Sequence, residues 1–407
     1  MSLNKFRGVT KNALMSIVLV TNAFVWYYFV INFLQKIVKT MPADSVAPTL
    51  VWSFHFAGFA FSALAGSALA NKVQNKRSFL IFWMALGTAT SLASTLMDLT
   101  YIPNILILSP LLGISLGLGM PSCMGYFTET IQVQNRGRVG GITLLLSGVG
   151  MAVLKLAVGD NIFLQTIVLA ALRITGLIFL LFLGSSISKS NLAKNRAPSF
   201  KSVINQRSFL LYLVPWTLFS LITYLTTPIQ SGIVGRSMVD NLLVIENVLI
   251  GTFAIVGGFF ADAVGRKRIA ISGFVLLGLG YSVLGLSPDP LFGMYFYTVV
   301  DGVAWGMLFT VFVVTIWGDL SQHLPSEKYY AIGVLPFFIS KYLQIILGTA
   351  MAEAIPGTAI FSFTAVFLFL AVLPLVYAPE TLPEKTMRDR ELKIYIEKAQ
   401  KVRQKYA

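Results

Sequence analysis

Residues 242–286 read LLVIENVLIGTFAIVGGFFADAVGRKRIAISGFVLLGLGYSVLGL, and this stretch decides the fold class. It contains two apolar runs, 242–260 and 269–286, separated by a short segment that carries Arg266, Lys267 and Arg268. A helix that crosses a bilayer needs about 20 mostly apolar residues. The stretch therefore predicts two membrane-spanning helices joined by a tight basic loop.

The whole 407-residue chain is apolar in composition. Hydrophobic residues make up 56% of it and charged residues only 12%, about half of the roughly 25% that is usual in soluble domains. This composition excludes a soluble enzyme, and it excludes a disordered chain because disorder requires low hydrophobicity and high charge. We predict an all-α membrane protein with twelve transmembrane helices, near residues 12–33, 47–70, 79–97, 104–126, 139–158, 163–184, 208–229, 242–260, 269–286, 291–316, 331–352 and 359–378.

Positive charge lies almost entirely on one side of these predicted spans. Both termini and every second loop hold 25 of the 31 Lys and Arg residues, whereas the opposite loops hold only Lys36, Lys39 and Arg236. Cytoplasmic loops of membrane proteins carry the excess of Lys and Arg. The distribution predicts a multi-pass protein of the cell (plasma) membrane with both termini in the cytoplasm. It also accounts for the net charge of +14 without a nucleic-acid partner.

Two halves of the chain repeat one another weakly, at an offset close to 190 residues. Glu129 and Arg138 recur as Asp319 and Lys328 with the same spacing. The longest polar break between spans is rich in Ser, Lys and Asn, as expected for a linker. We predict an N-terminal six-helix half at 1–184, a cytoplasmic linker at 185–207, a C-terminal six-helix half at 208–378, and a cytoplasmic tail with an amphipathic helix at 379–407.

Three loop motifs resemble those of the major facilitator superfamily of secondary transporters. The strongest is the segment from Gly258 to Arg268, which is similar to the family's Gly-x-x-x-Asp-x-x-Gly-Arg-Lys loop signature. Glu129 followed by Arg136-Gly137-Arg138 resembles the family's loop after helix four, and Pro379-Glu380-Thr381 resembles the ending of sugar-porter-like members. The resemblance implies two pseudo-symmetric six-helix bundles around a central site.

In the family, such loops act as latches of a gate. The gating residues that the resemblance implies here are Gly258, Asp262, Gly265, Arg266, Lys267, Arg268, Glu129, Arg136, Arg138, Asp319 and Lys328. The alternative interpretation is that these charges are only signals of membrane topology.

Ionisable residues inside the spans are functional candidates, because a charge at the bilayer centre is costly unless it is paired or hydrated. Asp301 and Lys341 each lie about ten residues into a span, or roughly 15 Å deep at the helical rise. Since consecutive helices are usually neighbours, we predict that they pair and that Asp301 couples transport to protons. A static ion pair is the alternative. Arg173 reaches similar depth on a helix that the resemblance assigns to the scaffold, and Lys155 and Glu246 are expected to snorkel at the outer face.

The substrate site is predicted around Asp301. Tyr297, Asp301 and Trp305 are four residues apart and share one helical face, and Lys341 shares a face with Gln344. Flat rings with a few charged and polar groups are typical of small-molecule sites, although the rings alone are also consistent with packing or lipid contact. The resemblance implies that helices one and seven also line the cavity. The predicted substrate-binding residues are Asn22, Trp26, Tyr224, Thr227, Gln230, Tyr297, Trp305, Lys341 and Gln344.

Together these features predict a secondary active transporter that moves a small organic metabolite, an organic acid or a sugar, by alternating access and proton-coupled uptake. The expected partners are the substrate, protons and the lipid bilayer, and the expected state is a monomer. No Gly-x4-Gly-Lys-Ser/Thr nucleotide loop occurs. His55, His323 and Cys123 do not form a metal-ligand motif, so no catalytic residue, metal or cofactor is expected. The alternatives are a drug or metabolite efflux antiporter and a non-transporting membrane sensor with the same fold.

Overall fold

The computed structural model describes residues 3–42, 45–73, 75–159, 161–183, 197–234, 236–322, 324–354 and 357–382. Within these ranges, 12 helical segments are long and apolar enough to cross a membrane, which confirms the twelve predicted spans. The amphipathic helix predicted for the tail falls almost entirely outside the described residues.

The first six spans are built from seven α-helices. They are α1 (Leu3–Lys39), α2 (Ala47–Ala70), α3 (Lys76–Leu96), α4 (Ile102–Gly117) continued by α5 (Met120–Thr130), α6 (Arg136–Val158) with the short helix η1 (Val133–Asn135) before it, and α7 (Ile162–Leu183). At the break between α4 and α5, position 119 has room only for glycine, because a Cβ there would lie 2.0 Å from the Trp83 ring, and Pro121 lies in the first turn of α5. The buried Trp83 ring therefore occupies the space beside the backbone at this turn.

The short helix α8 (Phe200–Ile204) precedes the last six spans. These are α9 (Arg207–Val234), α10 (Arg236–Val264), α11 (Arg266–Leu286), α12 (Pro290–Phe309) extended by η3 (Thr310–Thr315) and α13 (Ile316–Leu320), α14 (Glu327–Ala354), and α15 (Gly357–Leu370) with α16 (Val372–Tyr377). Segment η3 is a π-helix, which shifts the rotational register of the residues after it. Asp319 lies in the turn that this shift orients.

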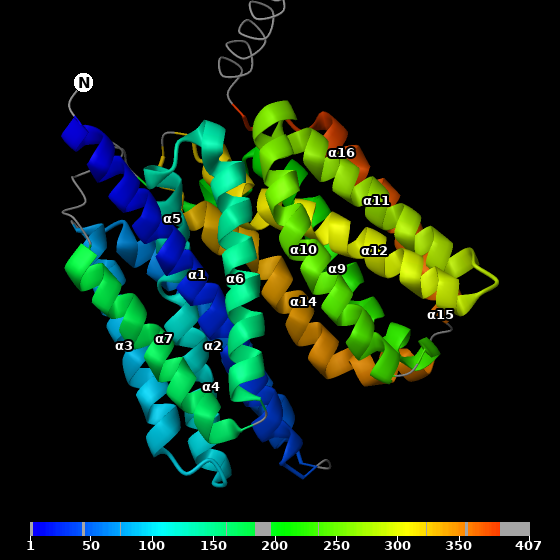
Figure 1. Ribbon diagram of the computed structural model, residues 1–407, viewed down its shortest axis with the longest axis horizontal. Helices are drawn as coiled ribbons and strands as arrows, with labels where there is room; N and C mark the ends of the chain where they lie inside the picture. Colours follow the sequence, from blue (N-terminus) through cyan, green and yellow to red (C-terminus); the bar gives the residue numbers. More distant parts are fainter. Residues whose placement is uncertain are drawn as a thin grey trace, which may run out of the picture.

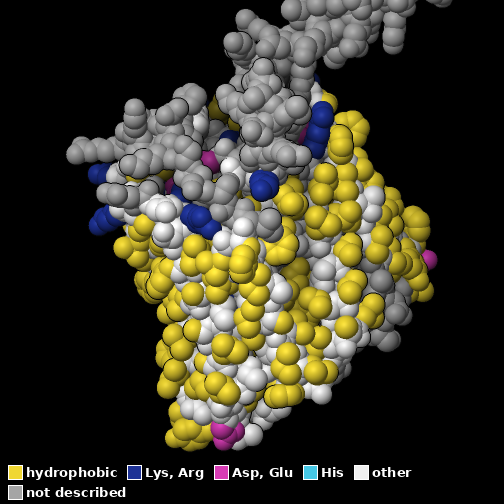
Figure 2. Space-filling view, turned by 60° about the vertical axis from the view of Figure 1, so that its left-hand side comes forward, with side chains coloured by type: hydrophobic (Ala, Val, Ile, Leu, Met, Phe, Trp, Pro, Cys, Tyr) yellow, Lys and Arg dark blue, Asp and Glu magenta, His cyan; other side chains and the backbone are white. Residues whose placement is uncertain are grey.

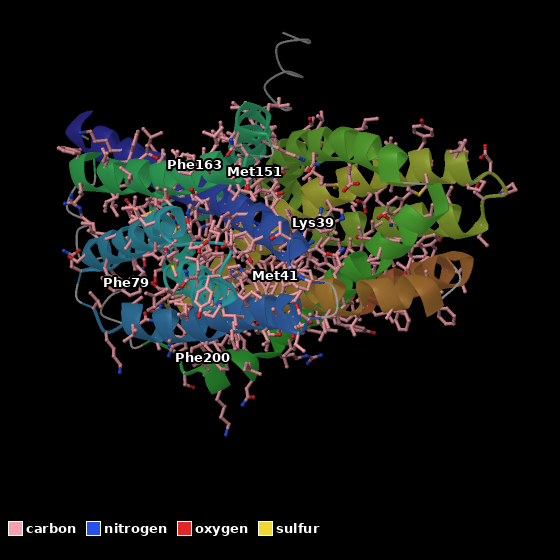
Figure 3. All side chains as sticks on the ribbon, turned by 90° about the horizontal axis from the view of Figure 1, so that it is seen from below. Lys39, Met41, Phe79, Met151, Phe163 and Phe200 are labelled. Carbon is pink, nitrogen blue, oxygen red and sulfur yellow. The ribbon has the colours of Figure 1, made fainter. Side chains whose placement is uncertain are left out.

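The spans form two groups that lie side by side when the molecule is seen from below (Figure 3). In the first group α2 packs on α4 and α3 packs on α7; in the second α10 and α11 pack on α12, and α9 packs on α14. The groups meet mainly through α6 with α10 and through α2 with α14 (Figure 1). The predicted division at 185–207 stays a prediction, because residues 184–196 lie outside the described part.

The α6–α10 contact brings two backbones together. A Cβ on Gly137 would lie 2.4 Å from the Gly258 carbonyl oxygen, and a Cβ on Gly258 would lie 2.2 Å from the Gly137 carbonyl oxygen. Only glycine permits an approach this close. The second glycine belongs to the loop motif, so that motif places one group of helices directly against the other.

One end of the molecule is basic. Figure 2 shows Lys and Arg side chains gathered at this end, above sides that are largely apolar. We call it the basic face; it comprises the described residues that follow α2, α5, α10 and α13 and precede α3, α6, α11 and α14. The other end is called the opposite face.

Candidate functional site

Buried ion pairs join the two groups of helices at the basic face. Asp319 accepts a hydrogen bond from Arg136 Nη1 at 2.6 Å and another from Arg266 Nε at 3.0 Å. Arg136 belongs to the first group, whereas Asp319 and Arg266 belong to the second. All three side chains are buried. One carboxylate therefore pairs with two guanidinium groups and joins the two groups of helices.

Asp262 makes a second connection between the groups. Its carboxylate accepts hydrogen bonds from the backbone N–H groups of Gly137 and Arg138, at 2.9 and 2.8 Å, at the start of α6. It also pairs with Arg266 Nη2 at 2.9 Å, and Arg138 Nε lies 3.7 Å away. An anion at a helix N-terminus is favoured by the free N–H groups and the helix dipole. The aspartate of the loop motif thus caps a helix of the other group.

The start of α11 is held by the chain after the last span. Gly265 has φ +115°, and the Glu380 carboxylate accepts hydrogen bonds from the backbone N–H groups of Arg266 at 2.8 Å and Lys267 at 3.2 Å. Lys267 Nζ donates to the Val376 carbonyl oxygen at 2.6 Å. Arg268, also predicted to be a gating residue, is exposed. Gly265 and Glu380 therefore set the geometry that directs the Arg266 side chain inward.

Gly265→Ala is expected to destabilise the protein, because a side chain at this φ costs about 1–3 kcal/mol and the new Cβ would lie 2.3 Å from a Glu380 oxygen. Thermal unfolding of the purified protein measures the loss. Gly148→Ala is the matched control, since a Cβ at Gly148 meets nothing within 4 Å. Equal melting temperatures for the two variants would show that the Gly265 conformation is not required.

A third ion pair at the basic face was missed by the sequence prediction. Lys76 Nζ lies 2.5 Å from Glu129 and 2.6 Å from Glu327, so it links the start of α3 to the start of α14. Lys328 was predicted as the gating residue of this segment, but it donates to the Pro198 carbonyl oxygen and lies 4.8 Å from the Phe200 ring centroid. Glu327 precedes the predicted Lys328 by one residue, so the two side chains point about 100° apart around α14.

The predicted Asp301–Lys341 ion pair does not form. Asp301 accepts a hydrogen bond from Tyr297 at 2.9 Å, and Lys341 donates to Gln344 at 2.7 Å. The prediction assumed that consecutive spans are neighbours. Instead α12 packs on α10 and α11, whereas α14 packs on α9 and α2.

The actual neighbour of Asp301 is a second acid. The Glu246 carboxyl of α10 lies close enough to the Asp301 carboxyl for the two groups to interact electrostatically, so it faces inward instead of snorkelling at the outer face. Two carboxyl groups that lie close together in a buried site repel each other when both are charged, which favours a proton on one of them. Asp301 is 2% exposed. We call Glu246 and Asp301 the acid pair.

A chain of hydroxyl groups leads away from the acid pair. Tyr297 donates to Asp301, the Tyr281 hydroxyl lies 3.1 Å from the Tyr297 hydroxyl, and the Thr226 hydroxyl lies 2.6 Å from that of Tyr281. The chain therefore connects α12, α11 and α9. The Trp305 indole also lies beside Asp301, although its N–H is not in hydrogen-bonding geometry.

Lys341 lies over one ring of an aromatic cluster that three helices form. Tyr224 of α9 lies 6.4 Å from Trp305 of α12 and 5.1 Å from Phe337 of α14, measured between ring centroids. Lys341 Nζ lies 5.2 Å from the Tyr224 centroid. The structure thus brings together four predicted residues, Tyr224, Trp305, Lys341 and, through its hydrogen bond, Gln344.

The first group of helices contributes Tyr27 to this region. The Tyr27 ring lies 5.3 Å from Phe338 and is close enough to Tyr224 for their hydroxyl groups to interact electrostatically. His55 orients it: Nε2 lies 3.3 Å from the Tyr27 hydroxyl, and Nδ1 lies 3.0 Å from the Ser109 carbonyl oxygen. Tyr27, the residue after the predicted Trp26, is therefore the one on α1 that lies near Tyr224.

The predicted residues Asn22 and Trp26 lie elsewhere. Asn22 donates to the Leu172 carbonyl oxygen, and Trp26 donates to Ser91 at 2.9 Å. Arg173 is fully buried between Trp26 and Trp83, with its guanidinium carbon 3.9 and 4.8 Å from their centroids. These residues tie α1, α3 and α7 together within the first group.

Two further predicted residues lie on α9. Thr227 is partly exposed and donates to the Thr223 carbonyl oxygen of its own helix at 2.8 Å. Gln230 is 8% exposed, and its amide nitrogen has no hydrogen-bond partner among the described residues.

No protein-family model and no curated protein matches the sequence. The structure is similar to a proton:xylose symporter, XylE, bound to 6-bromo-6-deoxy-D-glucose, with 15% identity, a TM-score of 0.67, and coverage of 92% of this chain and 96% of that one. A double-tryptophan variant of XylE gives 15% identity, a TM-score of 0.70, and coverage of 96% and 99%.

A third similar structure is the human organic anion transporter MFSD10, with 12% identity, a TM-score of 0.68, and coverage of 90% of this chain and 99% of that one. All three matches extend over at least nine-tenths of both chains, so they concern the whole arrangement of helices. The chain therefore has the twelve-helix fold of the major facilitator superfamily transporters.

Proposed function

We propose that the protein is a secondary active transporter that moves a small organic metabolite across the cell membrane by alternating access. The observation that carries this proposal is the set of buried charges shared between the two groups of helices at the basic face. Arg136 with Asp319, and Lys76 with Glu327, cross the junction. Such charges are satisfied in two ways: by each other when the face is closed, and by water when it is open. They are the parts expected of a gate.

In this scheme the structure is the state closed at the basic face. The positive-inside rule assigns that face to the cytoplasm, so the central site would next open there. The rings of Tyr27 and Tyr224 lie between the groups, where a substrate is exposed to either side in turn. A monomer contains all of these parts.

We infer that the acid pair couples transport to protons. Glu246 and Asp301 hold a proton while they lie close together in the closed site, and an opened site lets that proton leave to water. The hydroxyl chain through Tyr297 and Tyr281 offers donors and acceptors along the way. The similarity to a proton:xylose symporter supports coupled uptake, and the similarity to an organic anion transporter supports an organic acid as substrate.

Counterflow in proteoliposomes tests the proposal. Vesicles loaded with unlabelled xylose or benzoate should take up the same labelled compound faster than empty vesicles, and an inward proton gradient should drive net accumulation. A ligand-induced rise in melting temperature without any flux would instead identify a non-transporting sensor. If an inward proton gradient instead drives the substrate out of the vesicles, the protein is an efflux antiporter.

A further inference from the structure

Lys341 lies halfway along α14 and has no acidic partner among the described residues. Its ammonium group donates to Gln344 on its own helix and lies over the Tyr224 ring. An ammonium group has three donors, so these contacts leave donor capacity unused. The carboxylate once expected opposite it, Asp301, is occupied by Tyr297 and Glu246. A positive charge in the middle of a span is therefore left for a ligand.

Lys341 lies between the two groups of helices. Its neighbours Phe338 and Tyr342 contact the first group: Phe338 stacks on Phe59 at 3.7 Å, and the Tyr342 hydroxyl lies 2.8 Å from that of Ser53. On the other side of Lys341, Phe337 contacts rings of the second group. Lys341 projects between these two faces of α14 and is partly exposed.

The walls around the ammonium group are flat and apolar. The ammonium group lies over the Tyr224 ring, which contacts Phe337, and Tyr27 lies near Tyr224 and packs against Phe338. Aromatic rings favour offset-stacked or edge-to-face contact with another ring. A sugar would leave the ammonium group without a counter-ion. An organic anion with a planar ring matches both the charge and the walls.

We propose that the site bounded by Tyr27, Tyr224, Phe337 and Lys341 binds an organic monoanion with a planar ring, whose carboxylate accepts hydrogen bonds from Lys341. This assignment rests on the proposed transport function, and it selects the acid over the sugar among the substrates considered there. The carboxylate contacts the ammonium group and the Gln344 amide, while the ring lies between the tyrosines.

Binding to the purified full-length protein in detergent tests the assignment, with benzoate as the probe. Benzyl alcohol keeps the ring and removes the charge, cyclohexanecarboxylate keeps the charge and removes the planar ring, and xylose has neither. Titration calorimetry is expected to rank benzoate first, with benzyl alcohol and xylose at least about tenfold weaker, since one charge-assisted hydrogen bond accounts for a factor of that size. Cyclohexanecarboxylate is expected to bind more weakly than benzoate because it cannot make the ring–ring contacts.

Variants at Lys341 locate the carboxylate. Lys341→Gln is expected to weaken benzoate binding about tenfold or more and to leave benzyl alcohol binding unchanged, whereas Lys341→Arg retains most of the benzoate affinity. Lys155→Gln is the matched control, because Lys155 is a lysine on an exposed side of α6. If Lys341→Gln does not fold, the wild-type ranking and Lys341→Arg still decide the question.

The failure of this assignment differs from the failure of the transport proposal. Xylose that binds more tightly than benzoate, or benzoate binding that Lys341→Gln leaves intact, would overturn the anion site even if xylose counterflow is observed. Benzoate that binds through Lys341 but shows no counterflow would support the site and contradict transport.

Discussion

Replacing Asp301 with asparagine is expected to abolish uphill accumulation of substrate while exchange across the membrane continues. The acid pair then has no second carboxyl group with which to share a proton, so substrate movement no longer requires proton movement. A gradient of one pH unit supplies about 1.36 kcal/mol, enough for roughly tenfold accumulation by a carrier that moves one proton with each substrate. For Asp301→Asn that ratio should fall to about one.

Proteoliposomes with an imposed pH gradient measure both quantities, because counterflow without a gradient reports exchange and net uptake reports coupling. Glu246→Gln should behave in the same way, since it removes the other member of the pair. Asp289→Asn is the control: its carboxylate caps α12 outside the spans and lies in the loop at the opposite face. Uphill transport that survives unchanged in Asp301→Asn would remove the acid pair from the coupling mechanism.

Asp319→Asn is expected to open the basic face. The substitution leaves Arg136 buried without an ion-pair partner and leaves Arg266 with Asp262 alone, and removing one partner of a buried pair costs about 3–5 kcal/mol. Both guanidinium groups recover water when the two groups of helices separate. The closed state therefore loses stability relative to the open one, and a shift of about 3 kcal/mol changes their ratio by roughly a hundredfold.

Thiol labelling measures that change. Ser321→Cys, in a background with Cys123→Ala, places a near-isosteric reporter at a site that is 2% exposed in the closed state. Labelling should be much faster with Asp319→Asn than without it. Asp98→Asn is the control: Asp98 is exposed, and hydrogen bonds from Thr100 lower the pKa of its carboxyl, so the wild type carries a charge there as well. Unchanged labelling in Asp319→Asn would contradict the latch.

The loop contacts followed closely from the motif. Asp262 and Arg266 are only four residues apart at one tight turn, so their pairing depends on local geometry. The sequence repeat pointed to Asp319 and the family's loop motif pointed to Arg136, and the structure brings these two residues together. Glu327 was missed in favour of Lys328, and Tyr27 in favour of Trp26, because neighbouring residues on a helix point about 100° apart. The one sequence signal for the Lys76–Glu327 pair was the positive charge of Lys76, which favours an acidic partner on another span.

The central site was harder to predict than the loops. Asp301 and Lys341 were assigned to each other because of their equal depth, but depth does not specify which helices are neighbours. Glu246 was assigned to the outer surface, yet α10 turns it toward α12. These errors have one cause, since a pattern of apolar residues leaves the rotation and the neighbours of a long apolar helix nearly undetermined.

By itself, the sequence determined that this protein lies in a membrane, how many spans it has, that one face is basic, and that Asp262 pairs with Arg266 across a short loop. Those properties follow from composition and from spacings of a few residues, where the covalent chain allows few alternatives. Only the tertiary structure decided that Asp301 faces an acid, that Lys341 stays without a carboxylate, and that Tyr27 faces Tyr224. Such contacts depend on how every helix is rotated against its neighbours, and that rotation is settled by the packing of all twelve spans together.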